Sequence, residues 1–159
     1  MNRATTLDLL RRTTEDLQRY MNEIPPERLH WHEAGEWSAH ETLAHSCEIE
    51  RHVVLLRMQR VTNEHQPLLK YFDEQAWHRE HYDAEQPVAE MLSDFGDARR
   101  QQIQLLEAQS DWSRWGLHET LQKRMSLAFI GRYAVRHTWE HLNQIASTQA
   151  AYELAHQEG

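Results

Sequence analysis

The chain has 159 residues, a length that fits one domain with its own hydrophobic core, and we predict a single domain over residues 1–159. Its 17 Lys and Arg against 25 Asp and Glu give a formal net charge of −8, which argues against a protein that binds nucleic-acid phosphates. The lone cysteine, Cys47, excludes a disulfide within the chain, and no apolar run approaches the roughly 20 residues of a membrane helix. The first residues lack the apolar segment of a signal peptide, so we predict a soluble protein of the cytoplasm.

The composition favours helices over strands. Only 5 Gly and 4 Pro leave few turning points, which favours a small number of long helices. The hydrophobic content is 40% and the mean hydropathy is −0.84, both low for a chain that must bury a core. Narrow apolar stripes on otherwise polar helices reconcile these values.

The first two predicted helices have clear boundaries. Apolar residues recur at three- and four-residue steps from about Thr6 to Met21, and the pair Pro25-Pro26 ends this helix. After a loop, Ser38 and Glu41 form a capping-box pattern that opens a second helix running to about Thr62. Apolar residues lie on more than one side of this helix, so we expect it to pack against two neighbours or a partner chain.

The second half of the chain predicts two further long helices. Residues 68–86 form either a short helix or a loop that lies over the bundle. The third long helix begins at Pro87 and ends near Gln109, and its stripe includes Phe95 and Arg99. After a connector at residues 111–116, the last helix runs from about Leu121 to Leu154, with close packing expected at Gly131.

These elements predict an all-α protein, because no segment has a convincing alternating strand pattern. Four long helices form a bundle, and the long segment between the second and third helices favours crossover connections over a simple up-and-down arrangement.

Two histidines of the last helix indicate a metal site. His137 and His141 are four residues apart, so their rings lie on one face, which is the apolar face of this helix. Each buried imidazole brings a donor and an acceptor that need partners, and a shared divalent metal satisfies both rings. The alternative is that each ring bonds a carbonyl or a carboxylate without a metal. Position 138 is Thr, so the general-base Glu of the zincin motif is absent.

A third ligand has to come from another helix. The second helix offers His40, His45 and His52. His45 lies between small residues at a position expected to face inward, but His52 lies on almost the same side one heptad later. The spacing alone does not choose between them.

Two segments of the chain resemble the DinB-like (DinB/YfiT-like) superfamily of metalloenzymes. Residues 37–45 contain the "WS..E.L.H" element of that family, and residues 137–145 contain its "H...H..QI" element. The resemblance extends over nearly the whole chain. It implies a four-helix bundle with crossover connections, often a homodimer, and a divalent metal bound by His45, His137 and His141.

The resemblance also implies a range of functions. Family members of known activity include S-transferases that use glutathione, mycothiol or bacillithiol, and a maleylpyruvate isomerase. We therefore predict a metal-dependent transferase or hydrolase that acts on a small thiol or a small electrophile and uses Ni, Zn or Fe. The alternative is a non-catalytic, metal-stabilised dimeric module for stress or interaction, because the sequence identifies no general base or nucleophile around the ligands.

Other polar residues have mostly structural interpretations. We expect Cys47 to be a buried small hydrophobe. His118 is a proton shuttle at the mouth of the site or a loop residue with a hydrogen bond. Glu48 and Glu140 are candidate hydrogen-bond partners of the ligand imidazoles, whereas Glu41 is used by the cap. Six histidines are expected on the surface: His30, His32, His65, His78, His81 and His156. Four tryptophans are expected to anchor the core and connector, although one can line a pocket: Trp37, Trp112, Trp115 and Trp139.

Overall fold

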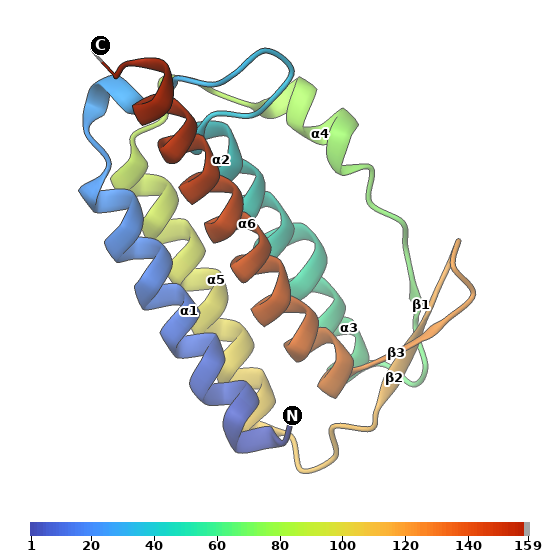
Figure 1. Ribbon diagram of the computed structural model, residues 1–159. Helices are drawn as coiled ribbons and strands as arrows, with labels where there is room; N and C mark the ends of the chain where they lie inside the picture. Colours follow the sequence, from blue (N-terminus) through green and yellow to red (C-terminus); the bar gives the residue numbers. More distant parts are fainter. Residues whose placement is uncertain (158–159) are drawn as a thin grey trace.

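A computed structural model describes residues 1–157 and contains four long helical rods and a small sheet (Figure 1). In chain order the elements are α1 (Arg3–Glu23), η1 (Pro26–Arg28), α2 (Ala39–Ile49), η2 (Glu50–Leu55), α3 (Leu56–Asn63), β1 (Leu68–Leu69), α4 (Glu74–His81), α5 (Val88–Ala108), β2 (Trp115–His118), β3 (Arg124–Ser126) and α6 (Leu127–Ala155). The segments α2, η2 and α3 form one continuous rod, in which η2 is a π-helical turn.

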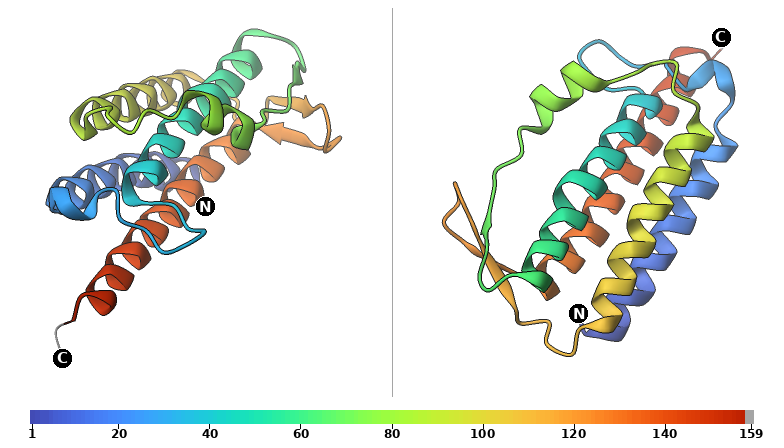
Figure 2. Two further views of the ribbon diagram at one scale, coloured as in Figure 1. Left: turned by 90° about the horizontal axis from the view of Figure 1, so that it is seen from above. Right: turned by 180° about the vertical axis from the view of Figure 1, so that it is seen from behind.

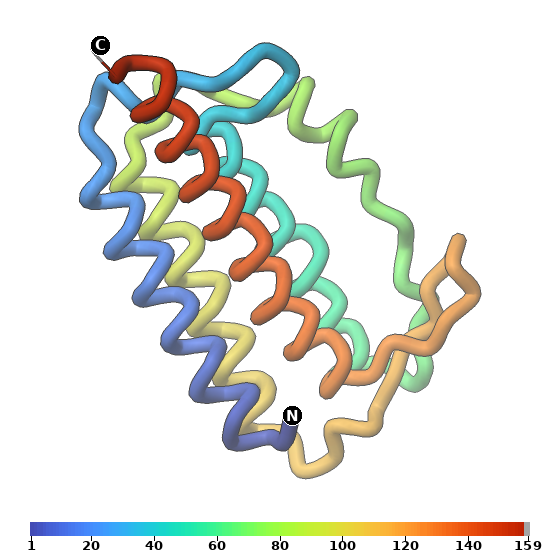
Figure 3. The backbone as a smooth tube through the Cα atoms, viewed as in Figure 1, coloured from blue at the N-terminus to red at the C-terminus, as the bar shows by residue number. Residues whose placement is uncertain are grey.

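The four rods form a bundle with a crossover connection, as predicted. The rods α1 and α6 run in one direction, whereas α2–α3 and α5 run in the other (Figure 3). Helix α1 packs against α5 and α6, and α2 packs against the same two helices, so these two consecutive helices lie diagonally opposite each other (Figure 2). The segment with β1 and α4 returns the chain to the end where α5 begins, and α4 packs against α2.

The predicted start of the second helix is confirmed. The Glu41 backbone N–H donates to Ser38 Oγ at 3.1 Å, and the Ser38 N–H donates to Glu41 Oε1 at 3.4 Å. The rod continues to Asn63, close to the predicted end at Thr62. The π-turn at Glu50–Leu55 was not predicted, because the apolar pattern does not distinguish it from an α-helical turn.

The all-α class is confirmed, but a small sheet was not predicted, and the predicted start of the last helix was wrong. Residues 115–126 form a hairpin of β2 and β3, and β1 pairs in parallel with β2. Helix α6 begins six residues later than predicted, at Leu127, because Ser126 caps it by accepting from the Phe129 N–H. A side chain on Gly116 would meet Leu69 at 2.7 Å, so glycine permits β1 to lie against β2.

Close packing at Gly131 is confirmed. A Cβ at this position would lie 3.2 Å from Thr6 Cγ2 and 3.3 Å from Leu106 Cδ1. The absence of a side chain therefore lets α6 approach α1 and α5. No helix within residues 1–157 has both the length and the apolar character needed to cross a membrane.

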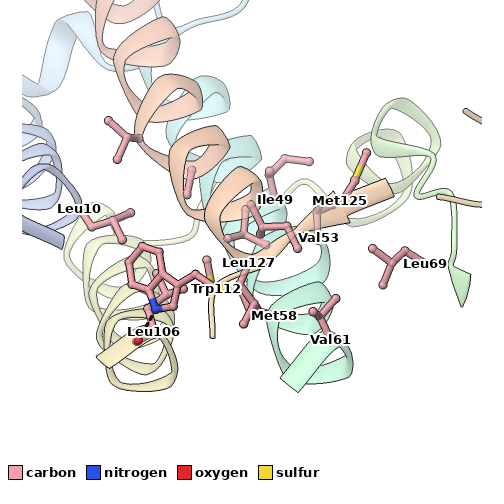
Figure 4. Packing of buried hydrophobic residues seen from close by; sticks show 14 residues of the cluster. Leu10, Ile49, Val53, Met58, Val61, Leu69, Leu106, Trp112, Met125 and Leu127 are labelled. Atoms are coloured by element: carbon pink, nitrogen blue, oxygen red, sulfur yellow. Dashed lines mark hydrogen bonds between the residues drawn. The ribbon is translucent and has the colours of Figure 1, made fainter. Parts of the chain in front are cut away.

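The core has two apolar clusters, and one polar layer lies between them. The first cluster fills the end of the bundle near the N-terminus and includes Leu10 and Leu127 (Figure 4). There the Trp112 indole N–H donates to the Leu106 carbonyl at 2.8 Å, which anchors the connector after α5 (Figure 4). The second cluster fills the other end and includes Phe95.

The polar layer is built on a buried ion pair. Arg99 of α5 is 1% exposed and Glu50 of η2 is 0% exposed, and Arg99 Nη2 lies 2.8 Å from Glu50 Oε1. Arg99 also donates to the Leu10 carbonyl and to Thr13 Oγ1 of α1, both at 3.1 Å, and to Thr138 Oγ1 of α6 at 2.9 Å. One guanidinium thus joins all four rods. Its position on the apolar stripe of α5 is explained by these partners.

We predict that Arg99→Met destabilises the protein strongly. The substitution leaves the Glu50 carboxylate buried without its cation, which costs about 3–5 kcal/mol of unfolding free energy. Urea denaturation monitored by circular dichroism measures the change.

The matched control is Arg100→Met at the next position. The Arg100 side chain is 65% exposed and pairs with Asp97, so its loss is expected to cost less than about 0.5 kcal/mol. Equal effects of the two substitutions would contradict the structural role of the buried pair.

Candidate metal centre

The structure brings together the three histidines that the resemblance implies. His45 comes from α2, whereas His137 and His141 come from adjacent turns of α6. One nitrogen from each ring lies within 4.8 Å of the others. His45 and His137 are buried and His141 is half-buried.

The spacing of the α6 pair fits coordination of one cation. His137 Nε2 and His141 Nε2 are 2.9 Å apart. This is the length of a hydrogen bond between the two rings, and it also leaves both nitrogens close enough to bind one cation at about 2.0–2.1 Å each.

The hydrogen bonds of the rings leave nitrogens available for a metal. His141 Nδ1 lies 3.0 Å from Gln144 Oε1 and donates to it, which leaves the lone pair on Nε2. His45 Nδ1 is buried and has no hydrogen-bond partner. Buried polar atoms without partners are uncommon, and a cation bound by this nitrogen would satisfy it. His137 Nδ1 also lacks a partner, but a cation bound at His137 Nε2 would not change this.

The electrostatic environment keeps the rings neutral. Burial lowers the pKa of His45 to about 4 and that of His137 to about 2, and it also lowers the pKa of His141. The neighbouring imidazoles add to the shifts of His45 and His137, because a second positive charge close by is unfavourable. All three rings are neutral at pH 7, the form that binds metals.

Two aromatic side chains hold the ligand rings in place. Trp37 meets His45 edge to face, with ring centroids 5.0 Å apart, and Tyr133 stacks on His137 at 5.5 Å. Of the four tryptophans considered, Trp37 is the one against a ligand ring; Trp112 is buried in the core and Trp139 is 44% exposed.

His78 is a functional candidate that the sequence analysis placed on the surface, and this was wrong. It lies on α4, is 6% exposed and stacks on Trp37 with ring centroids 4.6 Å apart. Its Nδ1 is 3.5 Å from Glu48 Oε2 and its Nε2 is 3.8 Å from Glu41 Oε2. The segment lacks an apolar period, so its burial depends on this long-range stacking.

Glu48 contacts His78 and not a ligand of the three-histidine group. Its side chain is 13% exposed, and burial raises its pKa to about 7. Glu140, the other expected partner of the ligand rings, is largely exposed and pairs with Arg136 at 3.3 Å. Glu41 forms the capping box as expected, and it also faces His78.

The remaining candidates lie outside the three-histidine group. His52 stacks on Phe72 and Trp77, and His40 contacts the Tyr82 hydroxyl at 2.8 Å. Cys47 is a buried small hydrophobe, as predicted: its thiol donates to the Met91 carbonyl at 3.1 Å, and burial raises its pKa. His118 is buried on β2, and its contacts are with α3 and the hairpin.

The comparisons with known proteins identify the family. The model of the DinB superfamily matches residues 9–145. The chain belongs to the DinB superfamily. Among solved structures it resembles YfiT from Bacillus subtilis, with a TM-score of 0.83 and 17% sequence identity over 94% of this chain and 87% of that one. YfiT is described as a probable metal-dependent hydrolase with an unusual four-helix bundle topology. No curated protein matches the chain.

We predict that the metal-free protein loses stability as the pH falls below about 6.5. An unfolded histidine binds a proton near pH 6.5, whereas native His45 and His137 do so only near pH 4 and pH 2. Between pH 6.5 and the native pKa of each ring, the unfolded state binds more protons than the native state. As the pH falls through this range, each of the two residues therefore lowers the free energy of unfolding by about 1.4 kcal/mol per pH unit. Urea denaturation of chelator-treated protein between pH 7 and pH 4.5 measures the slope.

The variant His45→Asn is expected to have a shallower slope. The control, His65→Asn, changes an exposed loop histidine and is expected to keep the wild-type slope. A slope for His45→Asn as steep as that of the wild type would contradict the assignment of a buried neutral ring.

Proposed function

We propose that the chain is a metal-dependent enzyme in which His45, His137 and His141 hold one divalent cation, namely Ni, Zn or Fe. The observation that carries the proposal is the convergence of three neutral imidazoles from two rods, with His137 Nε2 and His141 Nε2 2.9 Å apart. Membership of the DinB superfamily and the description of YfiT as a probable metal-dependent hydrolase support it.

A cation held by three imidazoles acts as a Lewis acid that lowers the pKa of a bound water or thiol. The protein's own groups supply orientation and proton handling. Gln144 fixes the ring of His141, and Trp37 and Tyr133 fix the other two rings. Glu48, with a pKa of about 7, can hold or release a proton at Oε2 beside His78, whose ring packs near His45.

The reaction that we propose is hydrolysis of a small electrophile. General acid–base catalysis favours a group whose pKa lies near neutral pH, and burial raises the pKa of Glu48, which lies beside His78, to about 7. The second candidate is an S-transferase that uses a low-molecular-weight thiol. The family resemblance favours it, because family members of known activity include S-transferases that use such thiols. A bound cation would lower the pKa of a thiol as it would that of water. The homodimer that the resemblance implies stays a prediction.

We predict that protein purified without chelators carries one divalent metal per chain. Added zinc is expected to raise the Tm of chelator-treated protein, since a ligand at a hundredfold excess over its Kd adds about 2.7 kcal/mol of stability. The variant His137→Ala is expected to lose both the metal and the rise in Tm. Elemental analysis and differential scanning fluorimetry measure these effects.

The matched control is His52→Ala, which removes a histidine of the same rod that lies outside the three-histidine group. This variant is expected to bind metal like the wild type. An unchanged zinc response in His137→Ala would contradict the proposed ligand set.

We predict that activity towards small esters, amides or thiol–electrophile pairs depends on the metal and on Glu48. Chelation is expected to abolish turnover and metal addition to restore it, and Glu48→Gln is expected to lower kcat by about 10²-fold with unchanged metal content. The control Glu140→Gln changes an exposed carboxylate and is expected to be neutral. Activity that survives chelation would contradict the proposal. Metal-dependent stability without turnover on any substrate would instead favour the non-catalytic module.

A further inference from the structure

An apolar cavity lies beside the three-histidine group. It has a volume of about 270 Å³ and lies among η2, α3, α6 and the β2–β3 hairpin. Its apolar lining includes Val53, Met125, Phe129 and Ile130. Tyr133 is also part of the lining, and the same ring stacks on His137. One aromatic side chain therefore separates the cavity from a proposed metal ligand.

The polar end of the cavity contains a guanidinium without a carboxylate partner. Arg57 is half-buried, and its Nη2 donates to the Lys70 carbonyl at 3.2 Å while its Nη1 contacts Met125 Sδ at 3.9 Å. Within residues 1–157 no carboxylate forms an ion pair with it, and burial lowers its pKa. The fully buried guanidinium of Arg99, by contrast, is paired with Glu50. Arg57 thus has the charge but lacks the counter-ion.

His118 adds a second donor beside Arg57. Its Nδ1 accepts from the backbone N–H groups of Thr120 and Leu121, both at 3.3 Å, so in the neutral ring Nε2 carries the proton. That Nε2 lies 3.2 Å from Arg57 Nη2, which is also a donor. Two donors therefore converge at the cavity without an acceptor between them. An anionic oxygen between the two groups would accept a hydrogen bond from each of them and so satisfy both donors.

Arg136 also lines the cavity, but its charge is already compensated. Its Nε pairs with Glu140 Oε1 at 3.3 Å, and its side chain is 60% exposed. The unsatisfied positive charge of the cavity is therefore that of Arg57.

We infer that this cavity binds a small monoanionic molecule with an apolar body, whose carboxylate accepts from Arg57 and His118 while its apolar part contacts Met125, Phe129 and Ile130. A cavity of about 150 Å³ takes up benzene, so the larger volume here accommodates one ring with a short acidic side chain. The site adjoins His137 through Tyr133, and the inference that its ligand is the substrate rests on the proposed function. The structure thus assigns the substrate class as small apolar carboxylates.

The test compares phenylacetate with its neutral analogue phenylacetamide on chelator-treated protein, by isothermal titration calorimetry and ligand-observed NMR. Phenylacetate is expected to bind at least tenfold more tightly than the amide. Arg57→Gln is expected to abolish this preference and Arg57→Lys to retain part of it. The control Arg60→Gln removes a nearby guanidinium that pairs with Glu64, and it is expected to bind like the wild type.

Two results would overturn the inference: equal affinity for the acid and the amide, or an Arg57→Gln variant that folds and keeps the preference. If Arg57→Gln does not fold, two other single variants test the inference: Arg57→Lys, and Ile130→Phe, whose larger side chain fills the cavity. Unchanged phenylacetate affinity in both of these variants would overturn the inference. Because metal-free protein is used, failure of the metal-centre proposal leaves this binding intact, whereas a protein that binds metal but not phenylacetate refutes the carboxylate site alone.

Discussion

The buried pair of Arg99 and Glu50 is the constraint on which the arrangement of the bundle depends. Apolar contacts are tolerant of small shifts, whereas a buried charge requires its partners at hydrogen-bond distance. Arg99 meets this requirement with groups from the other three rods, including Thr138 of α6. Thr138 follows the metal-ligand candidate His137 directly, and Glu50 lies on the same rod as His45. The ion pair therefore fixes the relative height of the two rods that carry the three histidines.

Much of the fold was predictable because helical periodicity reports which face of a helix is buried. The pair His137 and His141 could be assigned to one buried face in this way, and the capping box at Ser38 depends on local hydrogen bonds alone. The strands were not predictable because each has at most four residues, and their pairing depends on contacts far apart in the sequence.

For the candidate site too, local spacing predicted some residues, whereas others depend on contacts between distant segments. Spacing could not choose between His45 and His52, since an ideal helix places them on nearly the same side, and the family resemblance was needed to select His45. In the structure His45 joins the other two histidines, whereas His52 packs under Phe72 and Trp77. His78 was missed because it lies on a short helix outside the four rods and is buried by side chains from other segments, including Trp37 and Glu48.

The wide π-helical turn at Glu50–Leu55 lies between His45 and Arg57 on a single continuous rod. Such a turn closes its hydrogen bonds one residue later than an α-helical turn, so it takes up one extra residue within a continuous rod. Deletion of one of these six residues would restore α-helical winding and leave Arg57 directed towards Met125 and His118 as it is now. A one-residue deletion in an α-helical part of the rod between His45 and Arg57 would instead turn Arg57 by about 100° relative to His45. The wide turn is thus the segment of this rod where a change of length by one residue leaves the two sites in the same relative direction.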